Sequence, residues 1–247
     1  ESEKAANQFG VMSVDDSGRI IHFEEKPDKP MTIPGQKSMA LASMGVYLVT
    51  SEYLLASLQE DALSEVSGHD FGKDIIPKGI ERGDHFHAHT FQNPTNDDPP
   101  YWRDVGTIDS YYSANIELLK PEPPLNLYDP DWSTVTYQRQ LPPAVFNCSG
   151  IGANVQSSMI SGGCVLGNSQ VRSSILFSEV SVGSYCELDG VLALAGCRIG
   201  ANSKLRNVIL DNGCIVPEDT TVGYDLRSDS ANFHVTEGGT VVINRRM

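Results

Sequence analysis

In the first half of the 247-residue chain, the spacing of apolar residues alternates between strand-like and helix-like periods. Apolar residues predict strands over 9–14 and 20–25, joined as a hairpin by the turn-forming run at 15–18. A third strand is expected over 42–50, which is rich in Met, Val, Tyr and Leu, and a fourth over 85–92. Helical patterns separate these strands, which indicates an α/β unit.

Three helices are expected between and after these strands. Ser51 is the expected cap of a helix that ends near Gln59. Asp70 is the expected cap of a second helix, in which Ile75, Ile76 and Ile80 share a face and Pro77 must be tolerated near the first turn. The third spans 108–119 behind Thr107.

The second half of the chain repeats itself. Triplets of one small or polar residue followed by two apolar residues begin at Ser158, Ser174, Gly190 and Asn207, at spacings of 16, 16 and 17. Two further ladders keep nearly the same step; they are Leu166, Val182 and Ile199, and Val171, Leu188 and Leu205. Three short strands in each repeat predict a triangular parallel β-helix of the hexapeptide type. A β-sandwich or a leucine-rich array requires longer strands or a helix in each repeat.

Two segments flank this repeat. Residues 121–146 carry six prolines and predict a linker that lies on a surface and is ordered by Tyr128 and Trp132. Residues 224–247, with Phe233-His234-Val235 and 240–243, are expected to cap the solenoid or to contact another subunit.

Charge and composition narrow the functional classes. With 18 basic and 32 acidic residues, the formal charge is −14, and the longest basic cluster is Arg245-Arg246. Nucleic acid and anionic membranes are therefore not expected partners. No apolar run is long enough to span a bilayer. Five scattered cysteines without a CxxC motif predict reduced core thiols in a cytoplasmic protein and no structural zinc; they are Cys148, Cys164, Cys186, Cys197 and Cys214.

Two short motifs carry the candidate chemistry. Lys26 follows Glu25 and precedes Pro27, which suits a point charge fixed at a strand end to bind one phosphate. Asp104 follows Tyr101-Trp102-Arg103 at a glycine-containing turn, where a sugar can lie against a ring and a divalent ion can meet a carboxylate. The ordinary alternatives are that Asp104 helps to start the helix behind Thr107 and that Lys26 is a solvated strand end.

Six ordered motifs, followed by hexapeptide coils, resemble the bacterial, glycogen-forming type of glucose-1-phosphate adenylyltransferase. They are Phe23-Glu24-Glu25-Lys26-Pro27, Ala42-Ser43-Met44-Gly45-Val46-Tyr47, His69-Asp70-Phe71-Gly72-Lys73-Asp74, Tyr101-Trp102-Arg103-Asp104-Val105-Gly106-Thr107, Tyr128-Asp129-Pro130-Asp131-Trp132 and Leu141-Pro142-Pro143-Ala144. The resemblance covers essentially the whole chain. It implies the sugar-phosphate part of a nucleotidyltransferase domain over 1–120, a linker over 121–146 and a left-handed β-helix with a C-terminal cap over 147–247.

The resemblance also implies an activity and a set of site residues. The family transfers AMP from ATP to glucose 1-phosphate, giving ADP-glucose and pyrophosphate, with magnesium as cofactor. Lys26 matches the lysine that binds the sugar phosphate, and Asp104 matches the second of two aspartates that bind magnesium. The remaining positions match the sugar site or lie in motifs that line it; they are Glu25, Ser43, Tyr47, Asp70, Phe71 and Trp102.

One departure from the family limits this expectation. The family also has a glycine-rich loop with Arg and Lys for the ATP phosphates and a first magnesium aspartate, both upstream of the motifs found here. The run Ser161-Gly162-Gly163-Cys164 belongs to the repeat and does not replace that loop. We therefore expect the later part of a subunit, without turnover by itself. The resemblance also implies a tetramer regulated by metabolites, for which Arg206, Arg245 and Arg246 are candidate effector or interface contacts.

The sequence fits some other functional classes less well and leaves others open. Hexapeptide acyltransferases use a histidine on the coils, whereas all six histidines here lie outside 147–223. The alternating His85, His87 and His89 suit an exposed strand face better than a metal site. A regulatory subunit of the same fold and a guanylyltransferase that takes mannose 1-phosphate remain open alternatives.

Overall fold

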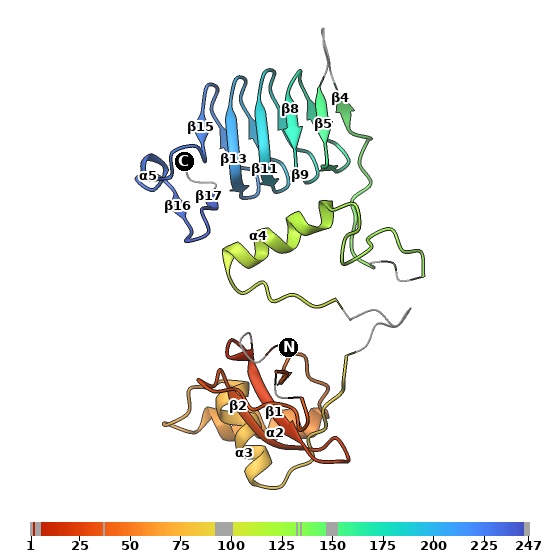
Figure 1. Cartoon of the computed structure of the whole chain (residues 1–247), viewed down its shortest axis with the longest axis vertical. Helices are drawn as coiled ribbons and strands as arrows, with labels where there is room; N and C mark the ends of the chain where they lie inside the picture. The colour runs from red at the N-terminus through yellow and green to blue at the C-terminus, as the bar shows by residue number, and fades with distance from the viewer. Residues whose placement is uncertain are drawn as a thin grey trace. The chain divides into compact units, whose positions relative to one another are not determined.

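The computed structural model describes residues 2, 6–36, 38–91, 101–131, 133, 135–146 and 153–244. It contains two compact units, Glu1–Phe91 and Gln92–Met247 (Figure 1). The sequence-based division at residue 120 differs from this one and stays a prediction. None of the helices in the described ranges combines the length and apolar character that crossing a bilayer requires.

The first unit is built on a small antiparallel sheet. Strands β1 (Gly10–Val14), β2 (Ile20–Glu25) and β3 (Leu41–Ala42) lie in the order β2-β1-β3. The carboxylate of Asp15 accepts hydrogen bonds from the backbone and the hydroxyl of Ser17 in the β1–β2 turn, which confirms the predicted hairpin.

The two other predicted strands are much shorter than expected. Beyond Ala42 the third strand does not continue, and Val46 and Leu48 are 79% and 104% exposed. A strand needs a neighbour for its backbone groups, and no described residue pairs with 45–50 as a strand. Over 85–92 only a bridge between Arg19 and His87 forms. Gln92 lies outside the described residues.

The histidines on this segment keep the predicted alternation. His85, His87 and His89 are exposed, whereas Phe86 and Ala88 pack against the core of the first unit. That core is formed by Ile20, Phe23 and Ile76.

Helices cover this sheet, and one cap differs from its prediction. Helix α2 (Ser51–Ala62) has Thr50, not Ser51, at its N-cap, because Thr50 has the extended backbone and Ser51 is already helical. The π-helix η1 (Phe71–Ile75) is capped by Asp70, as predicted, and runs into α3 (Ile76–Glu81). Pro77 is tolerated because it lies in the first turn of α3.

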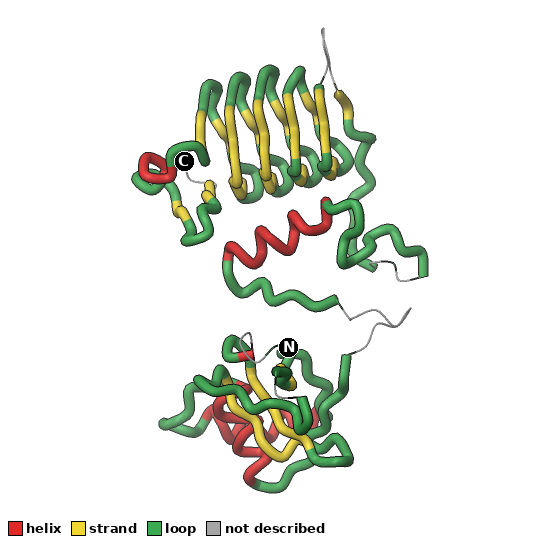
Figure 2. The backbone as a smooth tube through the Cα atoms, in the orientation of Figure 1, coloured by secondary structure: helices red, strands yellow, loops and turns green. Residues whose placement is uncertain are grey.

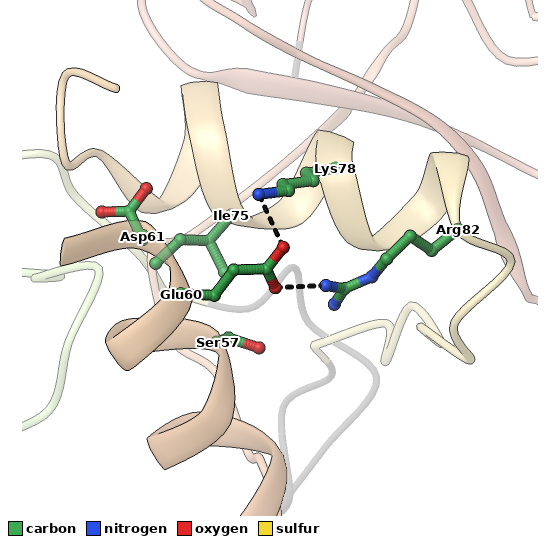
Figure 3. A pocket seen from close by; sticks show the side chains of 6 residues that line it. All are labelled: Ser57, Glu60, Asp61, Ile75, Lys78 and Arg82. Carbon is green, nitrogen blue, oxygen red and sulfur yellow. Dashed lines mark hydrogen bonds and ion pairs between the residues drawn. The ribbon is translucent and has the colours of Figure 1, made fainter. Parts of the chain in front are cut away.

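Ion pairs join α2 to α3 on the outer side. The carboxylate of Glu60 lies 2.8 Å from Lys78 Nζ and 2.6 Å from Arg82 Nη1 (Figure 3). The partly exposed side chains make this a surface network, which holds the two helices in register.

The second unit is a parallel β-solenoid, visible as stacked short strands in Figure 2. One face stacks five strands in the order β14-β12-β10-β7-β4. These are β4 (Val145–Phe146), β7 (Val165–Leu166), β10 (Ser181–Val182), β12 (Arg198–Ile199) and β14 (Ile215–Val216). The predicted hexapeptide solenoid is therefore confirmed.

The longer strands and their neighbours form the other faces. These are β5 (Asn154–Gln156), β6 (Met159–Ile160), β8 (Gln170–Arg172), β9 (Ile175–Leu176), β11 (Glu187–Ala193), β13 (Lys204–Leu210), β15 (Thr221–Val222), β16 (His234–Val235) and β17 (Val241–Ile243). The remaining helices of this unit are α4 (Ile108–Ile116), the 3-10 helix η2 (Glu117–Leu119) and α5 (Leu226–Asp229).

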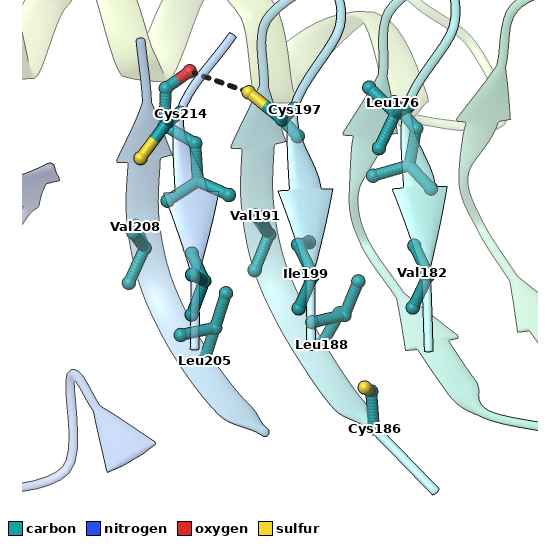
Figure 4. Close-up of a cluster of buried hydrophobic side chains, with 14 of the residues drawn as sticks. Leu176, Val182, Cys186, Leu188, Val191, Cys197, Ile199, Leu205, Val208 and Cys214 are labelled. Carbon is teal, nitrogen blue, oxygen red and sulfur yellow. Dashed lines mark hydrogen bonds between the residues drawn. The ribbon is translucent and has the colours of Figure 1, made fainter. Parts of the chain in front are cut away.

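Aliphatic side chains and thiols fill the solenoid interior (Figure 4). The predicted ladders point inward, since Leu166, Val182 and Ile199 are at most 3% exposed, and Leu188 and Leu205 at most 1%. None of the four described cysteines, which are Cys164, Cys186, Cys197 and Cys214, forms a disulfide, and all four are buried.

One predicted register is wrong by one residue. The repeat spacing of 16 between Ser174 and Gly190 predicts that Ile175 lies beside Val191. The structure instead pairs Ile175 with Leu192 and Leu176 with Ala193, a step of 17. A slip of one residue would turn the buried Leu176 outward, so burial decides the pairing.

Helix α4 and the C-terminal segment pack onto the solenoid. Tyr111 and Tyr112 of α4 contact a cluster made by Ile175, Leu192 and Ile209, one residue from each of three successive coils. Thr107 caps α4, as predicted. It does so through a capping box with Ser110, which the sequence analysis did not identify.

The C-terminal segment closes the end of the solenoid. Strand β17 continues the parallel stacking beyond β13, and β16 pairs antiparallel with β17. Phe233 and Val235 pack against the solenoid core, in agreement with the predicted cap.

Candidate functional site

One end of strand β1 gathers the first group of candidate residues. Gly10 is paired with Glu25 on one side, and its carbonyl accepts a hydrogen bond from the Ser43 backbone N–H at 2.7 Å on the other. The Lys26 backbone N–H donates to the Phe9 carbonyl at 3.0 Å. Backbone pairing alone therefore brings the positions of Glu25, Lys26 and Ser43 to the same sheet end.

Two glycines make room for the carboxylate of Glu25. A Cβ atom added at Gly10 would lie 2.8 Å from Glu25 Oε2, and one added at Gly72 would lie 2.6 Å from it. The carboxylate thus lies against the backbone at both glycines. Sequence reasoning missed this role of Gly10 and Gly72, although Gly72 stands in the quoted motif after Asp70.

Aromatic and hydroxyl groups continue the same site. The rings of Tyr47 and Phe71 are stacked with centroids 6.0 Å apart and an interplanar angle of 15°. The hydroxyls of Ser43 and Tyr47 lie 3.2 Å apart. Asp70 Oδ1 accepts hydrogen bonds from the backbone of the next turn, from Gly72 N at 2.8 Å and from Lys73 N at 2.9 Å. Asp70 therefore fixes the start of η1, from which Phe71 reaches Tyr47.

Lys26 stands at the exposed edge of this group. Its backbone φ of 51° lies in the left-handed region, which turns the chain sharply after β2. Pro27, which follows, is buried. The ammonium is carried on an exposed side chain next to the half-buried Glu25.

The first unit therefore brings together six of the predicted site residues. They are Glu25, Lys26, Ser43, Tyr47, Asp70 and Phe71. The cluster offers one cation, two carboxylates, two hydroxyls and an aromatic pair, a combination that suits a small polar ligand with one anionic group.

Asp104 belongs to the second unit and is exposed. Its Oδ1 accepts a hydrogen bond from Gly106 N at 3.2 Å, which shapes the turn before Thr107. The resemblance implies that Lys26 and Asp104 serve one shared site; because Lys26 belongs to the first unit, this shared site stays a prediction. A single exposed carboxylate fits one ligand position of a magnesium ion that also binds phosphates and water.

The residues before Asp104 are anchored on helix η2. Arg103 Nε lies 2.8 Å from Glu117 Oε1, and the Tyr101 hydroxyl donates to the same oxygen at 3.0 Å. The Arg103 guanidinium stacks on the Tyr101 ring, 4.9 Å from its centroid. Burial and the neighbouring Glu117 carboxylate raise the pKa of the Tyr101 phenol. Trp102 is half-buried within this segment.

An open groove of about 300 Å³ follows directly after Asp104. Residues at the start of α4, among them Val105 and Ile108, form one wall, and Ile209 and Val242 form the other.

In the described ranges, no group of three or more His, Cys, Asp or Glu side chains is arranged to hold a metal ion.

The structure describes one of the three candidate effector arginines, Arg206. Arg206 stacks on the Tyr224 ring at 4.7 Å and lies 3.9 Å from Asp189 Oδ2, so it has structural partners within the solenoid. Arg245 and Arg246 lie outside the described residues. An effector role for these three residues stays a prediction.

Comparison with known proteins relates both units to named families. Residues 1–121 match the nucleotidyl transferase family, and residues 142–243 match the GlmU-like C-terminal hexapeptide family. A protein of Shewanella baltica strain OS155 named glucose-1-phosphate adenylyltransferase is 46% identical over 247 residues. The alignment covers 99% of this chain and 59% of that relative. The chain is a homologue of the glucose-1-phosphate adenylyltransferases.

Other relatives agree with this assignment. A glucose-1-phosphate adenylyltransferase 2 of Pseudoalteromonas atlantica is 47% identical over 249 residues, and a glucose-1-phosphate adenylyltransferase of Teredinibacter turnerae is 44% identical over 248. Each alignment covers 99% of this chain and 59% of the relative. The resemblance found from the motifs is therefore confirmed, whereas the individual residue roles remain predictions.

Proposed function

We propose that this chain provides the sugar-phosphate half of an adenylyltransferase that makes ADP-glucose and pyrophosphate from ATP and glucose 1-phosphate. The observation that carries the proposal is the cluster of Glu25, Ser43, Tyr47, Asp70 and Phe71 beside Lys26 at one sheet end. Relatives at 44–47% identity with this activity in their names support it. The activity, substrates and partners of a complete enzyme are part of the proposal, since the chain spans 59% of the length of these relatives.

Each side chain in the cluster has a role that its chemistry suits. Glu25 and Asp70 accept hydrogen bonds from glucose hydroxyls, and the hydroxyls of Ser43 and Tyr47 donate or accept. Phe71 presents a ring to the apolar face of the sugar. Lys26 binds the phosphate as a point charge and neither donates nor accepts a proton during the reaction.

The reaction requires positioning and charge neutralisation more than proton transfer. A phosphate oxygen of glucose 1-phosphate forms a bond to the α-phosphorus of ATP, while the bond from that phosphorus to the β-phosphate oxygen breaks and pyrophosphate leaves. The nucleophile is already ionised at neutral pH, so no general base is needed. Lys26 holds this anion in line and offsets part of the charge that accumulates.

Asp104 is the proposed residue of this chain for magnesium. When bound, the ion supplies positive charge that neutralises the phosphate oxygens. The same proposal includes glycogen synthesis as the pathway and a homotetrameric assembly. It also includes a cytosolic location, because free thiols are typical of proteins in that compartment.

Calorimetric titration of the 247-residue chain tests the proposal. Glucose 1-phosphate is expected to bind at least about tenfold more tightly than mannose 1-phosphate, and Lys26→Ala should weaken it by about tenfold or more, because one charge-assisted contact is lost. Lys29→Ala is the matched control, since Lys29 is an exposed lysine in the same loop. Equal effects of the two lysine variants, or preference for mannose 1-phosphate, would overturn the proposal.

A further inference from the structure

A small polar cluster lies at the end of helix α2, just before the candidate sugar-binding residue Asp70. The carboxylate of Asp61 accepts a hydrogen bond from the Ser67 hydroxyl at 2.5 Å and a second from His69 Nδ1 at 2.8 Å. The Ser67 hydroxyl oxygen in turn accepts from the His69 backbone N–H at 3.0 Å. The Asp61 side chain is only 13% exposed, so these bonds are partly shielded from water.

The cluster holds a backbone conformation that His69 would not adopt freely. His69 has φ of 57°, in the left-handed region. A residue with a Cβ atom is disfavoured there by about 1 kcal/mol or more and persists only when its surroundings hold it. The contacts of Asp61 and Ser67 to the ring and backbone of His69 supply that support.

The direction of the chain after His69 sets the position of two proposed sugar contacts. Asp70 is the next residue and caps η1 through Gly72 N and Lys73 N. Phe71 follows and stacks on Tyr47. A change in the His69 backbone therefore moves the carboxylate of Asp70 and the ring of Phe71 together.

We propose that Asp61 is a positioning residue for the sugar site, and that it acts through Ser67 and His69 to orient Asp70 and Phe71. This inference rests on the proposed function, because it assumes that Asp70 and Phe71 contact glucose. Asp61 itself does not touch the substrate in this account.

The same three residue types could suggest a hydrolytic triad, but their contacts exclude it. In a triad the serine hydroxyl is bonded to the histidine ring, which removes its proton. Here the Ser67 hydroxyl donates to Asp61 and not to the histidine ring. His69 Nδ1 also bonds to the Asp61 carboxylate. Ser67 therefore has no activating base among these contacts, and the geometry fits a structural support for the loop.

Titration of Asp61→Ala against a neighbouring variant tests the inference. The dissociation constant for glucose 1-phosphate is expected to rise about tenfold in Asp61→Ala, because Asp70 and Phe71 lose their fixed orientation. Glu60→Ala is the matched control. Figure 3 shows the Glu60 carboxylate between Lys78 and Arg82 and the Asp61 carboxylate directed away from them. We expect Glu60→Ala to lower the melting temperature while changing the dissociation constant less than about twofold.

Asp61→Asn separates hydrogen-bond geometry from charge. The Asn oxygen can accept from Ser67 while its amide donates to His69 Nδ1, so near-normal binding is expected. Binding as weak as in Asp61→Ala would overturn the positioning role. If Asp61→Ala does not fold, Ser67→Ala removes only the bridging hydroxyl and should still weaken binding about threefold.

The outcomes distinguish this inference from the proposed function. If the unmodified chain does not bind glucose 1-phosphate, the proposed function fails. If the unmodified chain binds and Asp61→Ala binds equally well, the sugar site stands and the positioning role is wrong.

Discussion

At the scale of single residues, the site depends on small side chains as much as on reactive ones. Gly10 and Gly72 place backbone against the carboxylate of Glu25, and a methyl group at either position would enter its space. The carboxylate is the far end of a flexible side chain, so it can move aside at small cost in stability. At Gly72 binding should therefore be more sensitive than folding to such a change, whereas a Cβ atom at Gly10 would also overlap Cζ of the buried Phe23 and should cost stability.

Gly72→Ala tests this expectation. The added methyl group should displace Glu25 Oε2 and weaken glucose 1-phosphate binding about fivefold or more, while the free energy of unfolding changes by less than about 1 kcal/mol. Glu81→Ala is the control, because it changes an exposed side chain of the same unit that is not part of the proposed site. Parallel calorimetry and thermal unfolding measure both quantities, and a large loss of stability without a change in affinity contradicts the idea.

The buried thiols give a second prediction. Burial raises the pKa of the Cys164, Cys186 and Cys214 thiols, and that of Cys197 to about 11. Since the thiolate is the reactive form, these cysteines should react with a disulfide reagent at least about a hundredfold more slowly than free cysteine at pH 7.5. The measurement uses a Cys148→Ser variant so that only these four contribute. Fast labelling of the folded protein would contradict the assignment, and urea should restore the fast rate.

The sequence revealed the chemical groups of the site but not their supports. Glu25, Lys26, Ser43, Tyr47, Asp70 and Phe71 stand in motifs of recognisable order. The role of Gly72 depends on an approach between β2 and η1, and that of Asp61 on a loop that returns to the end of α2. Such contacts arise from tertiary packing, for which one sequence holds no periodic signal.

At the scale of elements, helix α4 is attached to the solenoid at two places. The Tyr112 hydroxyl donates to the Gly190 carbonyl at 2.7 Å, and burial raises the phenol pKa to about 12. In the first turn of the helix, Asp109 accepts from the hydroxyl of Thr236 at 2.5 Å, from that of Thr240 at 2.9 Å and from Gly238 N at 3.1 Å. Asp109 therefore joins the first turn of α4 to the C-terminal segment.

Asp109 should make the stability of this unit depend on acidic pH. The Thr236 hydroxyl bond is the main cause that lowers the Asp109 pKa below 3.8, its value without these contacts. Because the folded pKa is depressed, the stabilisation is present above about pH 4 and is lost as pH falls through the folded pKa. Asp109→Asn should lower the melting temperature at pH 7, and the difference from the unmodified chain should shrink below pH 4.

The control for this prediction is Glu218→Gln, which removes an exposed carboxylate from the same unit. It should melt like the unmodified chain across this pH range. A constant difference between Asp109→Asn and the unmodified chain from pH 7 to pH 3 would show that the charge of Asp109 is not the source of the effect.

Long periodic elements were predictable, whereas the pairing of the segments 42–50 and 85–92 was not. The solenoid ladders repeat over four coils, so several positions agree on the same inward face. The single-residue register error arose where Gly190 was aligned with Ser174, since both Val191 and Leu192 are apolar and the pattern cannot choose between them. The segment 42–50 has strand-like composition, but a strand exists only with a partner for its backbone.

At the scale of the whole molecule, the chain corresponds to 59% of the length of its relatives. Its 247 residues contain a candidate sugar-phosphate cluster but no glycine-rich loop with Arg and Lys of the kind that binds ATP phosphates in the family. Binding of the sugar phosphate and turnover should therefore be separable properties of this polypeptide.

The purified 247-residue chain should bind glucose 1-phosphate and yet release no pyrophosphate from ATP. A coupled pyrophosphate assay with ATP, magnesium and glucose 1-phosphate measures this, and an active homologue of full length serves as the positive control. Steady formation of ADP-glucose by this chain would show that it holds a complete nucleotide site, contrary to the prediction.

The packing of α4 also limits how the solenoid could change in length during evolution. Stacked coils with matching inner faces can in principle be duplicated or deleted as blocks of 16 or 17 residues. However, Ile175, Leu192 and Ile209 must stay in consecutive coils to form the continuous apolar surface on which α4 packs. Block insertions are therefore expected to survive selection before the coil of Ile175 and to be removed between that coil and the C-terminal segment that Asp109 contacts.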